Sequence, residues 1–510
     1  MPAAAVVSPA SAAKRHRLEP VKSKSCAKEI VDQEVELLGC GFFHTRMAMI
    51  LGLGNSADAV EILSMGYIIG SFESPIEPWE SSLVTSAVFL GMFFGGIVGT
   101  IMGDKCSRRL LMMACLAVNG VSGLCAALSP TVLWMSFFRF IAGVGIGGIA
   151  PMLFAVCLEH VPASARGKYI TVISAFWMVG SIFTALLAWV MLGCYWGTTI
   201  RIMNVSWRAF SVAASMPAFL TCGLIYLFVP ESPRFLVAKG KYQEASDTLT
   251  LIYAINGRSR LPDFSGPDGH EWVDEQSSTR LLTARHDSMQ WTDRLLLMFD
   301  SQPSVVNLKR TTILLLTSTF CLSFGSYGIS TWVTRVFQSM NVHNPYANDI
   351  LYAVAALPGN IVGLYLVDSW GRKPLFAWTL FLSALCGILF AADGGDSSTF
   401  IVLICCMFQC TTAMAWIGYD VLSAEVYPLH IRVSALCFLS STGRFGATLA
   451  QVVNGFLMGP PPHIEALLLI TTVVMAMGGV SVLFLDDNVD NQGGMKQKTT
   501  DHGESIRLLA

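Results

Sequence analysis

The chain has 510 residues and a formal net charge of −2 at pH 7. Hydrophobic residues make up 53% of it and charged residues only 13%, and the mean hydropathy is +0.56. A soluble domain carries about 25% charged residues, so this composition excludes an ordinary soluble protein. The near-neutral charge gives no indication of a nucleic-acid partner.

Residues 1–45 precede the first long apolar run and are mostly polar or small. The basic cluster Lys14-Arg15-His16-Arg17, among many Ala and Ser residues, predicts a cytoplasmic tail. We expect no cleavable signal peptide here. The tail is expected to end in a short interfacial helix over residues 29–45.

Twelve apolar runs follow the tail. Each is long enough to cross a bilayer as a helix, which takes about 20 residues. Backbone groups inside a bilayer must hydrogen-bond to one another, so each run predicts a transmembrane α-helix. We therefore predict an all-α polytopic membrane protein. The predicted spans are residues 47–70, 83–102, 110–128, 133–157, 169–192, 209–229, 311–334, 348–367, 375–392, 399–421, 434–457 and 464–485.

A charged turn between the second and third runs has a counterpart between the eighth and ninth. The first copy contains Asp104 and then Arg108 and Arg109, and the second contains Asp368 and then Arg372. The acid and the first base have the same spacing in both copies, and both turns join two apolar runs. These turns are too short to be anything but helix–helix connections.

A second pair of motifs recurs at nearly the same separation along the chain. Glu159, followed by Arg166, has its counterpart in Glu425, followed by Arg432. Two motifs that recur together at one spacing indicate a duplicated unit. We predict that the chain is two copies of one six-helix membrane unit.

The predicted halves are residues 46–229 and 311–487, with a polar loop at 230–310 and a tail at 488–510. Lys and Arg residues concentrate in the loops on one side of the predicted bundle, and such loops are usually cytoplasmic. Both termini and the central loop are therefore expected in the cytoplasm. The bases expected on the other side are Arg201, Arg208 and Arg335.

The first span contains two acids, Asp58 and Glu61, which share one helix face because they are three residues apart. Both lie near the predicted midplane, where an unpaired charge is costly and usually functional. They are our first candidates for substrate binding or proton coupling.

The repeated charged turn resembles the loop motif of the major facilitator superfamily, and the resemblance covers about residues 30–487. Ser107 stands where the family pattern has glycine, whereas Gly371 keeps it in the second copy. Gly39-x-Gly41-x-Phe43 and the Ala-Asp-Ala-x-Glu stretch of the first span resemble one branch more closely. That branch contains synaptic vesicle glycoprotein 2, its related protein and the nicotinate permeases.

The resemblance implies a transporter rather than an enzyme, with no cofactor. It implies alternating access and a small organic substrate, either a carboxylate such as nicotinate or an organic cation. The carrier is expected to be either proton-linked or facilitative. Two alternatives stay open. Residues 230–234, Pro-Glu-Ser-Pro-Arg, also resemble a sugar-porter motif, and some members of the branch are vesicle proteins with no established transport.

The resemblance also assigns roles to two arginines inside the spans. Arg139 begins an Arg-x-x-x-Gly-x-Gly-x-Gly stretch in the fourth span, and in proton-coupled relatives this arginine lies against the acid of the first span. It is therefore expected beside Asp58. Arg444 resembles an arginine of the eleventh helix in this family, with its role open.

The second half offers polar and aromatic side chains that suit the lining of a cavity for a flat organic ion. These substrate candidates are Trp416, Tyr419, Gln451 and Asn454. A gating role at the cytoplasmic side is expected for Asp104, Arg108, Arg109, Glu159, Arg166, Asp368, Arg372, Asp420, Glu425, Arg432 and Arg444.

The remaining expectations concern location and partners. Asn204 begins a glycosylation sequon, and Glu504, Leu508 and Leu509 fit an acidic dileucine signal read by clathrin adaptors. We expect a monomer in the plasma membrane or in an endosomal or vesicular membrane. Most cysteines fall inside apolar runs, so neither a disulfide framework nor a metal site is expected.

Overall fold

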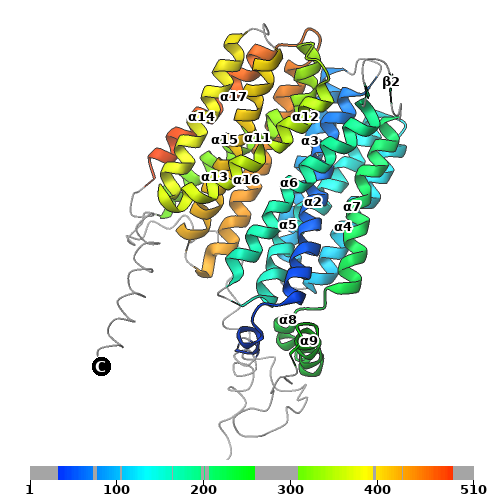
Figure 1. Ribbon diagram of the computed structural model, residues 1–510, viewed down its shortest axis with the longest axis vertical. Coiled ribbons are helices and arrows are strands. Elements are labelled where there is room, and N and C mark those ends of the chain that lie inside the picture. The colour runs from blue at the N-terminus through cyan, green and yellow to red at the C-terminus, as the bar shows by residue number, and fades with distance from the viewer. Residues whose placement is uncertain are drawn as a thin grey trace, which may run out of the picture.

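The computed structural model describes residues 31, 33–72, 77–103, 106–162, 165–193, 195–196, 200–201, 206–258, 308–393, 398–427 and 429–485. Two helical bundles stand side by side, with a smaller helical unit at one end (Figure 1). The first bundle contains α2 (Phe42–Gly70), α3 (Pro78–Gly103), α4 (Arg108–Leu128), α5 (Val132–His160), α6 (Arg166–Ala188), the π-helix η2 (Trp189–Gly193) and α7 (Trp207–Phe228). The second contains α11 (Leu308–Ser339), α12 (Pro345–Val354), α13 (Ala356–Ser369), α14 (Arg372–Asp393), α15 (Ser398–Val426), α16 (Leu429–Leu457) and α17 (Ile464–Leu483).

Short elements lie between these long helices. The helices α8 (Pro233–Ala238) and α9 (Tyr242–Ile255) follow the first bundle, within the predicted central loop. The strands β1 (Tyr195–Trp196) and β2 (Ile200–Arg201) pair in antiparallel fashion before α7.

Ten helical segments in the described part of the chain are long and apolar enough to cross a membrane. The other two predicted spans correspond to α2 and α16, which are 29 residues long but carry more polar side chains. The predicted all-α polytopic fold is thus confirmed. One predicted span, residues 348–367, is divided at Ala355, because Pro358 has no N–H to offer the carbonyl of Val354.

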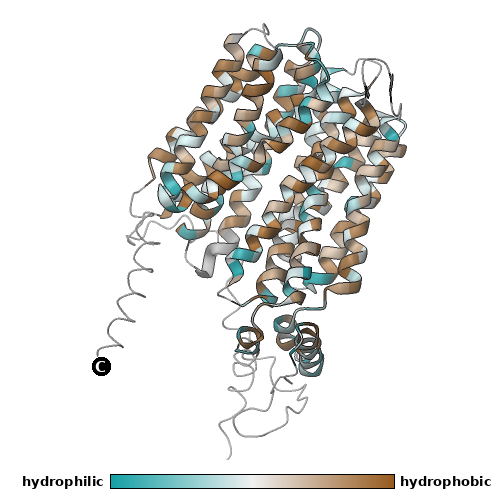
Figure 2. Ribbon diagram, viewed as in Figure 1, coloured by the Kyte–Doolittle hydropathy of each residue, from teal (hydrophilic) through white to brown (hydrophobic). Residues whose placement is uncertain are grey.

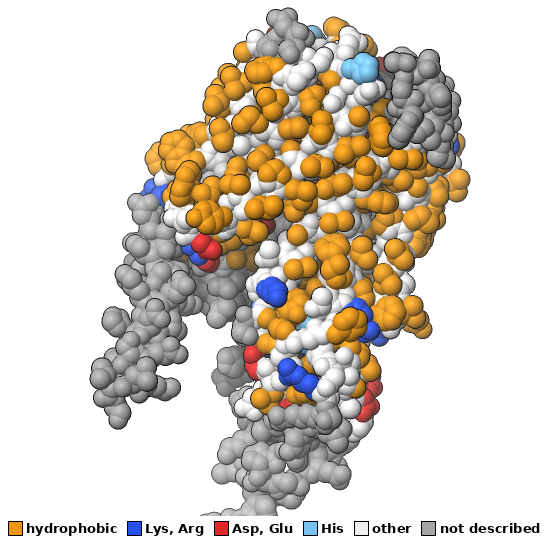
Figure 3. All heavy atoms as spheres, viewed as in Figure 1, with side chains coloured by type: hydrophobic (Ala, Val, Ile, Leu, Met, Phe, Trp, Pro, Cys, Tyr) orange, Lys and Arg blue, Asp and Glu red, His pale blue; other side chains and the backbone are white. Residues whose placement is uncertain are grey.

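Apolar side chains cover most of the outside of both bundles. Leu133, Leu220, Ile361 and Val473 are among the large hydrophobic residues more than half exposed. Hydrophobic residues run along the whole length of the long helices (Figure 2). On the face shown in Figure 3, Lys, Arg, Asp and Glu lie mainly toward the lower end, beside α8 and α9. Such a surface suits lipid around the bundles and water at that end.

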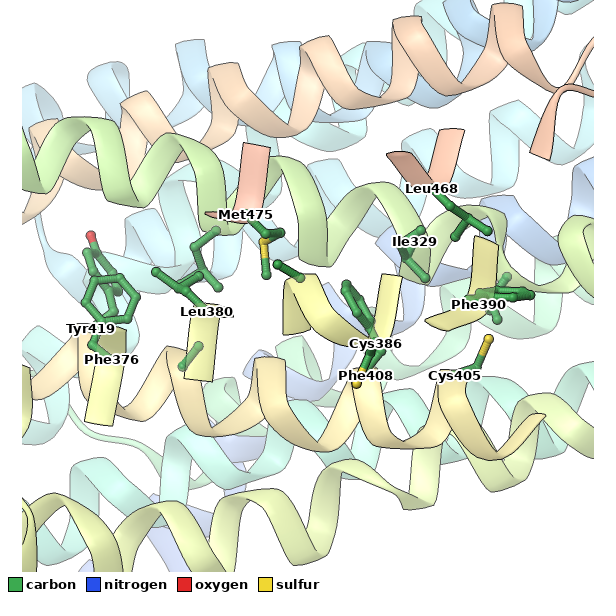
Figure 4. Close-up of a cluster of buried hydrophobic side chains, with 14 of the residues drawn as sticks. Ile329, Phe376, Leu380, Cys386, Phe390, Cys405, Phe408, Tyr419, Leu468 and Met475 are labelled. Atoms are coloured by element: carbon green, nitrogen blue, oxygen red, sulfur yellow. The ribbon is translucent and has the colours of Figure 1, made fainter. Parts of the chain in front are cut away.

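Each bundle has its own packed interior. In the second bundle Phe376, Leu380, Phe408 and Met475 belong to one buried cluster drawn from α14, α15 and α17, with further members from α11 (Figure 4). Between the bundles, α2 lies against α11, α3 against α16 and α6 against α12.

Glycines bring α3 and α5 into close contact. A Cβ atom on Gly95 would lie 2.2 Å from the carbonyl oxygen of Val144, and one on Gly147 would lie 2.2 Å from that of Met92. Neither distance is possible for a real side chain, so the two backbones approach as closely as small residues allow. The glycine-bearing face of α3 is therefore directed toward α5.

Gly95→Leu is expected to destabilise the fold by about 3 kcal/mol, the upper end of typical overpacking penalties, because α3 would be forced away from α5. The thermal unfolding of purified protein measures this. Gly223→Leu in α7 is the control, since nothing lies within 4 Å of a Cβ at that position. Equal melting temperatures for the two variants would contradict the close approach.

The segment before α2 packs against α9 at one end of the first bundle. Residues 33–38 are helical, and Val35 and Leu38 join the same buried cluster as Leu249. The hydroxyl of Tyr253 donates to Glu34 Oε2 at 2.8 Å. The interfacial helix expected over 29–45 was wrong in extent: Gly39, with a φ of +58°, ends one helix and α2 starts at Phe42.

Candidate functional site

The central feature of the first half is a buried ion pair between α2 and α5. Asp58, Glu61 and Arg139 are only 2%, 3% and 2% exposed. Arg139 Nη1 forms an ion pair with Glu61 Oε1 and donates to the backbone oxygen of Glu61 at 3.0 Å. Arg139 Nη2 donates to Ser64 Oγ at 3.0 Å. The guanidinium is thus held by one face of α2.

The expected pairing of Arg139 with Asp58 is wrong. Arg139 meets α2 at the level of Glu61 and Ser64, one turn beyond Asp58, and its contacts there occupy both terminal nitrogens. Asp58 is left with Oδ1 buried and without a hydrogen-bond partner in the described chain. The cation whose charge acts on Asp58 is Arg444, on α16 of the opposite half.

A group of aromatic rings surrounds Tyr327 where the two halves meet. Its ring centroid lies 5.2 Å from that of Phe89, 6.3 Å from that of Trp177 and 5.9 Å from that of Trp416. Arg444 lies over the same ring, 5.3 Å from its centroid, and Arg444 Nη1 donates to Tyr327 Oη at 2.9 Å. We call these four rings, Tyr327, Phe89, Trp177 and Trp416, together with Arg444, the aromatic cluster.

The aromatic cluster draws on both halves, with Phe89 from α3, Trp177 from α6 and the rest from α11, α15 and α16. Sequence reasoning found Trp416 and Arg444 but missed the other three members. The only signal was a tyrosine between small residues in Gly325-Ser326-Tyr327-Gly328. Arg444 has no carboxylate within ion-pairing distance in the described part of the chain, so its remaining donors can serve a ligand.

Two of the expected cavity residues hold helices together instead. Gln451 is fully buried, accepts from Trp332 Nε1 at 2.8 Å and donates to the backbone oxygen of Tyr327 at 3.1 Å. Asn454 donates to the backbone oxygen of Gly328 at 3.1 Å. Both amides thus join α16 to α11, because a buried amide in an apolar bundle takes the nearest backbone partner. Asn454 Oδ1 is buried and has no hydrogen-bond partner in the described residues.

Tyr419 also belongs to a packed interior. It is buried, and its ring centroid lies 5.9 Å from that of Phe376, within the cluster drawn in Figure 4. Trp416 connects this interior to the other members of the aromatic cluster. Its ring centroid lies 5.7 Å from that of Tyr419, and its Nε1 donates to Ser326 Oγ at 3.3 Å. Only Trp416, of the four residues expected to line a cavity, reaches the interface between the halves.

The two repeated motifs contact each other in the same way in each half. Arg108 forms an ion pair with Glu159. In the second half Arg372 Nε lies 3.1 Å from Glu425 Oε2, and Arg372 Nη2 lies 3.7 Å from Asp368 Oδ1. The same ion pair therefore occurs in both halves, in agreement with the duplication inferred from the spacing of the motifs.

Further contacts surround these pairs. Ser107 caps the start of α4 and its hydroxyl donates to Glu231, just before α8. Arg109 Nη2 donates to the backbone oxygen of Tyr226 at 2.6 Å. Arg166 begins α6, and Asp420 is exposed on α15.

Several expected residues cannot be placed. Arg432 lies in α16, but its side chain is outside the described part of the structure. The other residues outside it are Asp104, Asn204, Glu504, Leu508 and Leu509.

The halves are joined toward the end away from α8 and α9. Ser82 Oγ donates to the backbone oxygen of Val452 at 3.1 Å, and Gln338 Nε2 donates to that of Gly70 at 3.2 Å. At the other end the ion pairs of Arg108 and Arg372 each stay within one half. In Figure 1 the bundles accordingly lie close together near the top and apart near α8.

Two repeated bundles of membrane-length helices, with a buried ion pair inside the first and an arginine where they meet, are the architecture of a multi-pass membrane transport protein. The family model described as "Sugar (and other) transporter" matches residues 54–485. The chain belongs to this family of the major facilitator superfamily, as its motifs predict. It is a transporter-family protein and not an enzyme.

The curated relatives are similar over most of their length. Organic cation/carnitine transporter 7 of Arabidopsis thaliana is 29% identical, over 89% of this chain and 93% of its own. Niacin transporter NiaP of Acinetobacter baylyi is 25% identical, over 88% and 95%. Synaptic vesicle glycoprotein 2C of Homo sapiens is 24% identical, over 93% and 83%. The branch expected from Asp58 and Glu61 is thus among the relatives.

Solved structures share the fold. The inward-open conformation of the xylose transporter XylE from E. coli has a TM-score of 0.65 and 17% identity, covering 87% of this chain and 96% of that one. The D-xylose-proton symporter structure has a TM-score of 0.64 and 18% identity, covering 88% and 99%.

Proposed function

We propose that the protein is a secondary transporter that moves a small organic carboxylate together with a proton by alternating access. The observation that supports it most is Arg444, a cation held over Tyr327 at the meeting of the halves. Among the described residues, the Tyr327 hydroxyl is the one hydrogen-bond partner of its guanidinium. A guanidinium with free donors binds a carboxylate in two-point fashion. The surrounding rings suit a flat organic body.

This charge arrangement favours a carboxylate over the alternatives. A sugar porter needs free amides and hydroxyls to bind sugar hydroxyls, whereas both amide atoms of Gln451 and the Nδ2 of Asn454 are bonded to α11. A simple organic cation would face Arg444 at short range. Niacin and carnitine, the compounds in the names of two relatives, both carry a carboxylate.

Asp58 supplies the proton site in this proposal. It is buried in one half, and the positive charge of Arg444 acts on it from the other. A carboxylate bound to Arg444 offsets that positive charge. An ionised Asp58 is then no longer stabilised by Arg444. Because a lone charge in a bundle interior is costly, Asp58 takes up a proton. Substrate and proton thus bind together.

The end bearing α8 and α9 is assigned to the cytoplasm, following the basic loops. In this structure the two halves are joined at the end opposite α8 and α9. It therefore corresponds to the state that is open toward the cytoplasm. The Arg108–Glu159 and Arg372–Glu425 pairs are released or rearranged when that end closes. Both termini lie in the cytoplasm, and the carrier works as a monomer in the plasma membrane or in an endosomal or vesicular membrane.

Uptake into proteoliposomes tests the proposal. Nicotinate, carnitine, choline and xylose are offered with the lumen alkaline. We expect accumulation of a carboxylate, loss of it in Arg444→Gln, and partial retention in Arg444→Lys, which keeps the charge but not the two-point geometry. Lys309→Gln is the matched control, because it also removes one positive charge but lies in the first turn of α11, away from the aromatic cluster.

Two results would overturn the proposal. Transport of xylose or choline with no carboxylate flux would establish a sugar porter or a cation carrier. Absence of flux across a broad panel, with folded protein in the membrane, would favour a vesicle protein that binds a ligand without transporting it.

A further inference from the structure

A cavity of about 270 Å³ lies at the end where the halves meet, away from α8 and α9. Pro78 and Ser81, at the start of α3, form one wall. The other walls come from the opposite half: the end of α11, with Trp332 and Arg335, and the turn between α16 and α17. The cavity is far larger than a single water needs and close to the lower size of small-molecule sites.

The wall from α11 carries a cation without a partner. Arg335 is half-buried, and its guanidinium makes neither a hydrogen bond nor an ion pair in the described chain. The other arginines near the interface differ, because Arg139 pairs with Glu61 and Arg444 bonds to Tyr327. Partly burying an unpaired cation is unfavourable unless an anion completes the site.

The rest of the lining combines polar and apolar groups. Met458, Pro460 and Pro462 face the same space as Ser81 and Ser339, and neither proline has an N–H to donate. The amide of Gln338 is already bonded to Gly70. One cation, with hydroxyls and apolar side chains around it, matches a small anion with an apolar body, such as an aryl carboxylate.

The cavity has all of its walls only while the two halves are in contact at this end. Ser82 bonds to Val452 beside it, and a Cβ on Gly459 would lie 2.6 Å from Pro78. If the halves part at this end, Pro78 and Ser81 leave the other walls and the cavity opens. A ligand that binds only the joined state shifts the population toward it.

We propose that this cavity is a second binding site, which takes a small soluble organic anion on Arg335 and holds the transporter closed at this end. The binding itself is independent of the proposed function, whereas the effect on the cycle rests on alternating access.

Thermal unfolding of purified full-length protein tests the binding, with benzoate as the probe and benzamide as its neutral counterpart. The measurement uses an Arg444→Gln background, which removes the central cation. We expect benzoate, but not benzamide, to raise the melting temperature in a saturable manner. Addition of Arg335→Gln abolishes the rise, Arg335→Lys keeps part of it, and Lys309→Gln leaves it unchanged.

Ser339→Glu provides a second variant if Arg335→Gln does not fold. Ser339 lines the same cavity one helical turn beyond Arg335, so a carboxylate there would pair with the guanidinium. We expect Ser339→Glu to raise the melting temperature without ligand and to remove the response to benzoate.

Three outcomes would overturn the inference. A benzoate response that survives Arg335→Gln would place the anion elsewhere. A response present in the wild-type protein but absent in Arg444→Gln would assign it to the central site and leave the proposed function standing. Loss of the response in nanodiscs containing phosphatidylglycerol, but not in phosphatidylcholine alone, would identify a lipid headgroup as the occupant.

Discussion

Glu61→Gln is expected to lower the stability of the folded protein by about 3–5 kcal/mol, the range seen when one member of a buried ion pair is removed. Arg139 would keep its charge, at 2% exposure, and lose its only carboxylate partner in the described chain. As a candidate for substrate binding, Glu61 would be expected to change substrate affinity when it is replaced. The observed pairing makes it primarily a folding defect.

Thermal unfolding in detergent measures this effect, with an exposed ion pair as the control. Lys241 and Glu244 are paired on α9 with both side chains 56% exposed, and such surface pairs contribute about 0–1 kcal/mol. Glu244→Gln should therefore leave the melting temperature almost unchanged.

A double variant separates charge from packing. Glu61→Met with Arg139→Met removes both charges and should recover much of the stability that Glu61→Gln loses. A double variant less stable than Glu61→Gln would show that Ser64 and the backbone of α2, rather than the carboxylate, fix Arg139.

Asp58→Asn is expected to abolish proton-driven accumulation of substrate while leaving exchange between equally loaded compartments. Asparagine has nearly the same shape as aspartate but cannot take up a proton at physiological pH. Because Asp58 Oδ1 has no hydrogen-bond partner in the described residues, its replacement removes no bond at that atom. Stability should therefore hold or rise.

Uphill uptake under an imposed pH gradient, measured beside counterflow, tests this expectation. Continued accumulation by Asp58→Asn would mean that protons couple elsewhere in the bundle. Loss of counterflow together with accumulation would instead make Asp58 a substrate ligand. The melting temperature of the same preparation shows whether either result reflects unfolding.

The architecture was predictable because membrane helices and a duplicated motif are local signals. Twenty apolar residues must form a helix in a bilayer wherever their neighbours lie. The paired spacing of Arg108 with Glu159 and of Arg372 with Glu425 indicated two equivalent units, and the structure shows the same ion pair in each.

The partners of individual side chains were not predictable in this way. Asp58 and Glu61 lie one turn apart on the same helix, and only the relative height of α5 decides which of them meets Arg139. Gln451 and Asn454 have the same residue types whether they face a ligand or a neighbouring backbone. Tyr327 gains its importance from Phe89 and Trp177, which belong to the other half of the chain.

The bond between Tyr253 and Glu34 joins residues 219 positions apart and has a consequence for biosynthesis. A ribosome adds about 5–20 residues per second, so α9 emerges roughly 10–45 s after the segment that it covers. During that interval all six helices of the first half are synthesised, while the buried cluster around Val35 and Leu38 still lacks Leu249. Their docking on Leu249 marks the moment at which the first half is complete.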